Sequence, residues 1–229
     1  MAGRPVAAFV SAGLPRRGGR ALAEELYRGL REVADAFDTA IGGGDTNSWD
    51  GPLVISVTLL GEATPRGPVT RAGARPGDWL LVTGPLGGSI LGKHLDFTPR
   101  VREALALHQA ADLHALIDTS DGLAADLWHI LEESRVGAVL EEAKVPISEA
   151  AAAVRDGRSS LEHALSDGED FELLFTVSPG DGQALLDKPP CAALLSHIGE
   201  ITPGPGCSLK WTDGTVKPLA ALGWKHAFK

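Results

Sequence analysis

The chain has 229 residues, 44% of them hydrophobic, and its 21 Lys and Arg against 30 Asp and Glu give a net charge of -9. That length and hydrophobic content suffice for a buried core in one large or two small domains. The negative charge argues against a protein that binds nucleic acid by neutralising phosphates. It does not exclude a phosphorylated ligand, because Mg²⁺ can bridge phosphate oxygens and carboxylates.

Cysteine content and hydrophobic runs predict a cytoplasmic protein. Only Cys191 and Cys207 are present, too few for a disulfide framework, so reduced thiols are expected, while a single disulfide stays open. No apolar run of about 18 residues occurs, and Met1 to Arg20 lacks the pattern of a cleaved signal peptide. We therefore expect no membrane partner.

The N-terminal part predicts one α/β layer. Apolar Val6 to Leu14 predicts a buried strand that ends at Pro15. From Leu22 to Phe37 the apolar residues follow helical spacing, which predicts an amphipathic helix. Gly42 to Thr46 predicts a turn, and Leu53 to Leu60 is β-rich enough for a mostly buried strand.

The rest of the chain predicts a second α/β domain. Thr64 to Asp78 is rich in Pro, Gly and Arg, which places a boundary near residue 70 and divides the chain into domains at 1–70 and 71–229. Periodicity in the second domain predicts two strands (the later one with a single face inward), two helices and a final hairpin. These are Trp79 to Thr83, Phe171 to Val177, Val101 to Leu116, Leu123 to Leu131, and the stretch from Pro203 to Gly214.

The sharpest motif is Asp118-Thr119-Ser120-Asp121-Gly122, where an apolar strand end meets the start of a helix. Two carboxylates three residues apart at such a junction can share one or two hard cations. Amides at the helix start also attract phosphate. The alternative is that Ser120 or Asp121 only caps the helix, as these residue types do for local reasons.

Two further motifs are acidic or glycine-rich. In Gly43-Gly44-Asp45-Thr46 the glycines let the backbone approach a ligand and Asp45 can bind a cation, but a helix C-cap turn is the competing interpretation. In Asp167-Gly168-Glu169-Asp170-Phe171-Glu172 an acidic turn can hold a cationic or hydroxylated group of a substrate, or it is a solvated loop.

Other signals are weaker. Gly87 to His94 has the spacing of a P-loop, but His94 occupies the position of the magnesium-binding hydroxyl, so we reject that interpretation. Arg71 is either a phosphate contact or a surface side chain. The sequence contains no Gly-x-Ser-x-Gly elbow, His-Glu-x-x-His motif or Cys/His zinc spacing.

In their order along the chain these segments resemble the thiamine-monophosphate kinases, members of the superfamily that includes aminoimidazole ribonucleotide synthetase and selenophosphate synthetase. The resemblance covers essentially the whole chain, and the last two of its segments are the more family-specific. The segments are Met1 to Pro5, Gly43 to Thr46, Ile55 to Glu62, Arg71 to Asp78, Asp118 to Leu123, and Gly168 to Thr176.

The resemblance implies an α/β (α+β) fold. A partial N-terminal α/β dimerisation layer, the remnant of an ATP-binding domain at 1–70, would precede a C-terminal α/β domain at 71–229 with nucleotide and substrate contacts. The implied reaction is the ATP- and Mg²⁺-dependent phosphorylation of thiamine monophosphate to thiamine diphosphate. Transfer of the γ-phosphoryl group to a phosphate acceptor requires alignment and charge neutralisation, with no protein nucleophile.

The resemblance also assigns roles to residues. Asp118 and Asp121 are the implied catalytic residues, and together with Asp45 they are the implied Mg²⁺ ligands. The implied ATP contacts are Gly44, Asp45, Arg71 and Ser120, and the implied substrate contacts are Glu169 and Trp224, the latter in a terminal aromatic segment that continues through Lys225 to Phe228.

The chain departs from the family pattern in four places, one of them Asn47-Ser48-Trp49, where the family often has Thr-Arg. A preceding segment with an early Gly-Asp-Asp motif and strands of the dimer barrel is missing, so a homodimer is expected where that segment is present. Asp167 stands where Gly is usual, and Gly88 stands where Asp is usual. Two alternatives to a competent kinase stay open, a truncated nucleotide-binding remnant with poor catalysis and a sibling ATP-dependent enzyme of the same superfamily.

Overall fold

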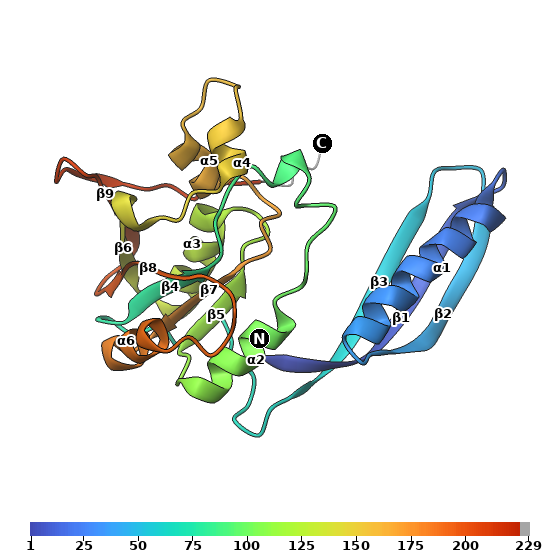
Figure 1. Cartoon of the computed structure of the whole chain (residues 1–229), viewed down its shortest axis with the longest axis horizontal. Helices are drawn as coiled ribbons and strands as arrows, with labels where there is room; N and C mark the ends of the chain where they lie inside the picture. The colour runs from blue at the N-terminus through green and yellow to red at the C-terminus, as the bar shows by residue number, and fades with distance from the viewer. Residues whose placement is uncertain (225–229) are drawn as a thin grey trace. The chain divides into compact units, whose positions relative to one another are not determined.

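The computed structural model describes residues 1–224 of the chain, which form two compact units (Figure 1). The smaller unit is Gly3–Gly67, and the larger unit comprises Met1–Ala2 and Pro68–Lys229. Both units combine helices with a sheet, which confirms the predicted α/β class. Among the described helices, none combines the length and the apolar composition that crossing a membrane requires.

The smaller unit is a three-stranded sheet with one helix. Its elements are β1 (Gly3–Pro15), α1 (Gly19–Ala36), β2 (Ala40–Trp49) and β3 (Val54–Ala63). The sheet has the order β2-β1-β3, with β1 parallel to β2 and antiparallel to β3. The helix α1 packs against β1 and β2, as the apolar stripe predicted from Leu22 to Phe37 requires.

The glycine-rich turn predicted at Gly42 to Thr46 is wrong, and so is its interpretation as a helix C-cap. These residues lie within β2, whereas α1 ends at Ala36. A Cβ added to Gly44 would lie 1.8 Å from the carbonyl oxygen of Val10 in the neighbouring strand. The glycines therefore allow close strand pairing rather than a change of chain direction.

The strand predicted at Leu53 to Leu60 is present, but its predicted burial is wrong. Every residue of β3 is exposed. It is an edge strand that pairs with β1 alone, and its large apolar side chains are between 41% and 59% exposed. These are Val54, Ile55, Val57, Leu59 and Leu60.

The larger unit is built on a seven-stranded sheet with the order β10-β9-β6-β8-β4-β7-β5, in which only the β6–β9 pair is parallel among the described pairs. Its strands are β4 (Trp79–Thr83), β5 (Ala115–Asp118), β6 (Gly137–Glu141), β7 (Leu173–Val177), β8 (Leu195–Thr202), β9 (Gly206–Lys210) and β10 (Val216–Pro218). Its helices are η1 (Ser89–Leu91), α2 (Val101–Ala110), α3 (Leu123–Ser134), η2 (Glu142–Lys144), α4 (Glu149–Ala153), α5 (Ser160–Ser166) and α6 (Pro179–Asp187).

Helices cover both faces of this sheet and create two cores (Figure 1). Along β7, Leu174 packs in the core that contains α3 and α5, whereas Phe175 packs in the core that contains α2 and α6. All five residues of β7 are buried. The prediction of a strand with one inward face is therefore wrong, because an alternating pattern of apolar residues cannot exclude a second buried face.

Two other boundaries differ from the prediction. The helix predicted from Val101 to Leu116 ends at Ala110, because Ala111 adopts an extended backbone with φ of -140°. The apolar residues that follow continue the core into β5 rather than extending the helix. The predicted final hairpin is formed by β9 and β10, joined through a hydrogen bond from the Trp211 amide to the Thr215 carbonyl of 2.8 Å.

Candidate active site

The junction between β5 and α3 holds the predicted Asp118–Gly122 motif. The residue at the N-cap of α3 is Gly122, which has no side chain to cap the helix. The buried carboxylate of Asp126 accepts the amides of Asp121 and Gly122 at 3.0 Å and 3.1 Å. Capping by Ser120 or Asp121 is therefore wrong as an explanation of the motif, and both side chains remain available for a ligand.

The same hydrogen bonds overturn one expectation about phosphate. The amides of Asp121 and Gly122 already donate to Asp126, so they are not open to a phosphate at the helix start. Burial raises the pKa of Asp126 to about 6, although the two amides favour its charged form. The motif analysis missed Asp126. The signal in the sequence was the presence of an acidic residue in the first turn of α3.

The donor groups at this junction fit a hard cation. In the described part of the chain, neither the Asp118 nor the Asp121 carboxylate makes a hydrogen bond or an ion pair. A carboxylate oxygen of Asp121 lies within 4.8 Å of ligand atoms of Asp126 and His129. Oxygen donors of this kind are the ligands that Mg²⁺ prefers.

The acidic turn after α5 is fixed against this junction. Glu169 and Phe171 have φ of 62° and 52°, a left-handed backbone that side chains rarely adopt. Their amides donate to the carbonyls of Ser120 at 2.7 Å and Thr119 at 2.8 Å. These bonds hold the turn in its strained conformation and place Glu169 beside Ser120.

Two acids of this turn are buried, so its interpretation as a solvated loop is wrong. Asp170 and Glu172 are each 1% exposed. One oxygen of Asp170 accepts the Gly87 amide at 2.8 Å and the other has no partner in the described residues. Burial raises the pKa of Asp170 to about 7.

The pKa of Glu172 shifts in the opposite direction to that of Asp170, because hydrogen-bond donors surround the Glu172 carboxylate. Its carboxylate accepts hydrogen bonds from Arg100 at 2.8 Å and 2.9 Å, from Lys93 at 2.8 Å and from Thr83 at 2.7 Å. Burial alone would raise its pKa, but these hydrogen bonds outweigh burial and hold the pKa of Glu172 below its ordinary value. The carboxylate is therefore a charged centre inside the larger unit.

In Gly87 to His94, the segment with P-loop spacing, the polar groups already bind acids of this turn. The amides of Gly87 and Gly88 donate to Asp170 and Asp167 at 2.8 Å and 2.9 Å. The Lys93 ammonium is paired with buried Glu172. The groups that would bind phosphate in a P-loop are thus engaged within the protein, in agreement with the rejection of that motif.

A pocket of about 750 Å³ unites four of the predicted site residues, Ser120, Asp121, Glu169 and Trp224. The amide of Trp224 donates to the Asp121 carbonyl at 2.9 Å, and 67% of Trp224 is exposed. The predicted aromatic segment from Lys225 to Phe228 lies outside the described residues. Sequence reasoning missed other lining residues, among them Asp156, Arg158 and His163, whereas Asp167 and Phe171 belong to the predicted acidic turn.

Four predicted residues do not line this pocket. Asp118 is exposed at the end of β5. Arg71 is exposed, and its carbonyl accepts the Ser134 hydroxyl at 3.0 Å. Gly44 and Asp45 belong to β2 of the smaller unit, where the exposed Asp45 carboxylate accepts a long hydrogen bond of 3.4 Å from Asn47.

Comparisons with known proteins give the family. Residues 75–212 match the family model described as AIR synthase related protein, C-terminal domain, and residues 1–63 match the corresponding N-terminal domain. The thiamine-monophosphate kinase of Rhodopirellula baltica is 45% identical over 228 residues, which cover 99% of this chain and 71% of the relative. The chain belongs to the thiamine-monophosphate kinase family. The kinase of Caulobacter vibrioides is 34% identical, with 98% of this chain and 69% of the relative covered.

Solved structures agree with membership in the thiamine-monophosphate kinase family. The kinase from Stenotrophomonas maltophilia has a TM-score of 0.81 at 32% identity, covering 93% of this chain and 73% of that one. A structure described as AaThiL complexed with AMPPCP and TMP has a TM-score of 0.80 at 28% identity, covering 99% and 75%. Hydrogenase maturation protein HypE, at 20% identity and a TM-score of 0.80 with 99% and 79% covered, shares the fold.

Gly88 and Asp167, two of the smaller departures from the thiamine-monophosphate kinase pattern, are in direct contact. The amide of Gly88 donates to the Asp167 carboxylate at 2.9 Å. Gly88 has φ of 73°, and a Cβ added there would lie 2.5 Å from the Ala151 amide nitrogen. No side chain fits at residue 88 without movement, so the carboxylate at this contact comes from Asp167.

The Asp170→Asn variant is expected to change the pH dependence of stability. Because folding raises the pKa of Asp170 from 3.8 to about 7, its stabilising contribution is complete below the unfolded pKa and is lost as pH rises towards 7. The neutral amide removes this loss. In urea unfolding without ligands, the variant should be about 1–3 kcal/mol more stable than the wild type at pH 8 and nearly equal at pH 4.

Glu25→Gln, at an exposed position of α1, is the control for a general effect of removing one negative charge. Equal stability differences for Asp170→Asn at pH 4 and pH 8 would contradict the assignment of the raised pKa to Asp170.

Proposed function

We propose that the chain transfers the γ-phosphoryl group of ATP to the phosphate of thiamine monophosphate, giving thiamine diphosphate and ADP. The observation that carries the proposal is the common pocket of Ser120, Asp121, Glu169 and Trp224. Those residues were assigned separately to ATP, Mg²⁺ and substrate by the family resemblance. The relative described with AMPPCP and TMP binds an ATP analogue together with that substrate.

The pocket has the chemistry that a cationic heterocycle needs. Trp224 and Phe171 line it, and aromatic faces attract cations such as the thiazolium ring of thiamine. Acidic side chains in the lining outnumber basic ones, namely Asp121, Asp156, Asp167 and Glu169 against Arg158 and His163. We assign Glu169 to the substrate and Trp224 to stacking on its ring.

We propose that Asp118 and Asp121 hold Mg²⁺, in accord with the carboxylates at the β5–α3 junction that make no hydrogen bond to the described chain. When bound, Mg²⁺ supplies neutralisation and alignment of phosphate charges. The chain itself contributes the rigid turn that Asp126 fixes and the hydroxyl of Ser120. Arg71 and Ser120 are the proposed ATP contacts, and the assignment of Gly44 and Asp45 in the smaller unit stays a prediction.

We propose that the reaction takes place in the cytoplasm. Cys191 and Cys207 are both free thiols, as is usual for proteins of a reducing compartment.

The exposed face of β3 supports a homodimer as the active assembly, in which a second copy covers the apolar side chains of β3. A row of such side chains on an unpaired edge strand is a surface that pairs with another chain. We expect light scattering to give twice the chain mass of 23.9 kDa. Val57→Asp should convert the dimer to monomer, whereas Leu95→Asp, at an 82% exposed side chain of the larger unit, should not.

A monomeric wild type at micromolar concentration would overturn the homodimer and leave β3 to another partner. Dimers that persist in Val57→Asp would place the interface elsewhere.

The proposed reaction is tested by incubating the chain with ATP, Mg²⁺ and thiamine monophosphate and measuring thiamine diphosphate and ADP by chromatography. We expect the two products in equal amounts. Binding of both substrates without product would favour the truncated binding remnant. Hydrolysis of ATP that is independent of thiamine monophosphate would favour a sibling enzyme with another acceptor.

A further inference from the structure

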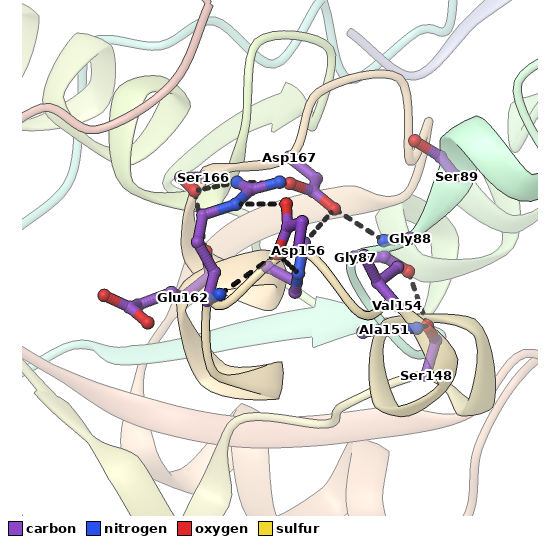
Figure 2. Close-up of polar contacts among 12 residues, drawn as sticks. Gly87, Gly88, Ser89, Ser148, Ala151, Val154, Asp156, Glu162, Ser166 and Asp167 are labelled. Atoms are coloured by element: carbon purple, nitrogen blue, oxygen red, sulfur yellow. Dashed lines mark hydrogen bonds and ion pairs between the residues drawn. The ribbon is translucent and has the colours of Figure 1, made fainter.

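A closed ring of four polar side chains forms one wall of the pocket, which Asp156, Arg158, His163 and Asp167 all line. Figure 2 labels the two acids of this ring, Asp156 and Asp167. The two nitrogens of His163 contact the carboxylates of Asp167 at 2.9 Å and Asp156 at 3.1 Å. The Arg158 guanidinium donates to the same two carboxylates, at 2.9 Å to Asp156 and 3.0 Å to Asp167. Each base therefore bridges both acids.

Within this ring, Asp167 is the member that joins other parts of the fold. Besides His163 and Arg158, its carboxylate accepts the amide of Gly88 at 2.9 Å (Figure 2). The three donors come from the loop before η1, from α5 and from the turn before α5. The Asp167 side chain is 12% exposed and the His163 side chain 1%, so the contact between these two is shielded from water, whereas the Arg158 side chain is 46% exposed.

The backbone on either side of the ring is fixed by its own hydrogen bonds. Arg158 directly precedes the capping box of α5, in which Ser159 and Glu162 bind each other's amides. This box holds the chain that carries the guanidinium. On the other side, the Gly168 carbonyl accepts the hydroxyl of Ser89, the first residue of η1, which directly follows Gly88.

The residue that follows Gly168 is Glu169, in the left-handed conformation with φ of 62°. For a residue with a side chain this conformation costs about 1–2 kcal/mol, so it persists only where neighbouring contacts determine it. The contacts of Asp167 lie immediately before this strained turn. The Asp167 carboxylate is thus anchored two residues upstream of Glu169, and both residues line the pocket.

We propose that Asp167 is a positioning residue for thiamine monophosphate: by tying Gly88, His163 and Arg158 together it orients the Glu169 turn and sets the affinity for this substrate. This inference rests on the proposed function, because the pocket is taken to hold thiamine monophosphate. ATP affinity and the phosphoryl-transfer step should depend much less on Asp167, since Asp126 holds the amides of Asp121 and Gly122 at the β5–α3 junction.

The test is the Asp167→Asn variant, whose amide oxygen can still accept from Gly88 but has no charge for Arg158 and His163. We expect both KM and the calorimetric Kd for thiamine monophosphate to rise about 10-fold, the equivalent of one charge-assisted hydrogen bond. The KM for ATP, kcat and the melting temperature should stay close to the wild-type values. Asp187→Asn, on the exposed side of α6, is the matched control and should change none of these quantities.

A double-mutant cycle separates positioning from a general loss of charge. Because Arg158 acts through Asp167, Arg158→Gln combined with Asp167→Asn should weaken substrate binding no more than Asp167→Asn alone. Asp167→Glu, which keeps the charge, should recover part of the affinity.

Three outcomes would overturn the inference. The first is an unchanged affinity for thiamine monophosphate in Asp167→Asn, and the second is a parallel loss of kcat, ATP affinity and thermal stability, which marks a structural role. The third is a wild type that binds no thiamine monophosphate, which would also remove the proposed function. A wild type that binds thiamine monophosphate without forming product, together with weaker binding by Asp167→Asn, would refute the kinase activity and support the positioning role.

Discussion

Replacing Asp121 by Asn is expected to lower kcat for thiamine diphosphate formation about 10²- to 10³-fold, the scale on which loss of one transition-state stabilising group acts. Asp121 is a proposed Mg²⁺ ligand, and a neutral amide neutralises less of the charge that accumulates on the phosphates. Its carboxylate makes no hydrogen bond to the rest of the described chain, so the isosteric change removes no contact of the fold. The melting temperature should therefore stay within a few degrees of the wild type.

The measurement is steady-state kinetics at several Mg²⁺ concentrations, because loss of a ligand should also shift the Mg²⁺ dependence to higher concentration. Asp126→Ala provides a contrast. It leaves the amides of Asp121 and Gly122 without their acceptor, so this variant should lose thermal stability as well as rate. Turnover of Asp121→Asn within threefold of the wild type would remove Asp121 from the proposed metal site.

Much of the local structure could be predicted because its signal lies in consecutive residues. The apolar spacing from Leu22 to Phe37 predicted α1, and the run from Trp79 to Thr83 predicted β4. The strand β2 was missed because Gly42 to Gly44 provide no side chains to alternate. Their function in the fold is close pairing with Val10 and its neighbours, a property of the partner strand that is invisible in the segment itself.

Burial was predicted less well than secondary structure because it depends on what covers each face. The apolar run of β3 predicted a buried strand, yet the smaller unit places no element over its side chains. Conversely, Asp170 and Glu172 were taken as exposed acids or ligands, and the structure buries both. Their partners Gly87, Lys93 and Arg100 lie more than 70 residues away in the sequence.

The candidate site shows the same division between local and distant signals. The residues Ser120 and Asp121 stand in one short motif, so the sequence could propose them. The ring of Asp156, Arg158, His163 and Asp167 has no motif spacing, and its connection to Gly88 spans 79 residues. Periodicity and composition cannot bring such segments together, whereas the antiparallel pairing of β4 with β7 places the segment after β4 beside the segment before β7.

Replacing Glu172 by Gln is expected to destabilise the larger unit by about 2–4 kcal/mol, the range for removing one partner from a buried ion pair that retains some solvent access. The side chain of Glu172 is 1% exposed, whereas Arg100 and Lys93 are 26% and 31% exposed. Without the carboxylate, both cations lose their shared partner, and Thr83 loses a charged acceptor. Lys93 and Arg100 would then move towards water and disturb the loop that leads into α2.

Urea unfolding monitored by tryptophan fluorescence measures this change. A Trp49→Phe background removes the tryptophan of the smaller unit, so the signal reports the larger unit alone. Glu141→Gln is the matched control, because Glu141 pairs with Lys144 at 2.6 Å while both side chains are at least 30% exposed. An exposed pair of this kind contributes about 0–1 kcal/mol.

The pH dependence gives a second, independent check on Glu172. Its folded-state pKa lies below the ordinary value, so its contribution is present above the unfolded pKa of about 4.3 and is lost as pH falls through the folded pKa. The stability difference between wild type and Glu172→Gln should therefore be full at pH 7 and decrease at acid pH. A loss at pH 7 no larger than that of Glu141→Gln would show that Arg100 and Lys93 do not depend on this buried carboxylate.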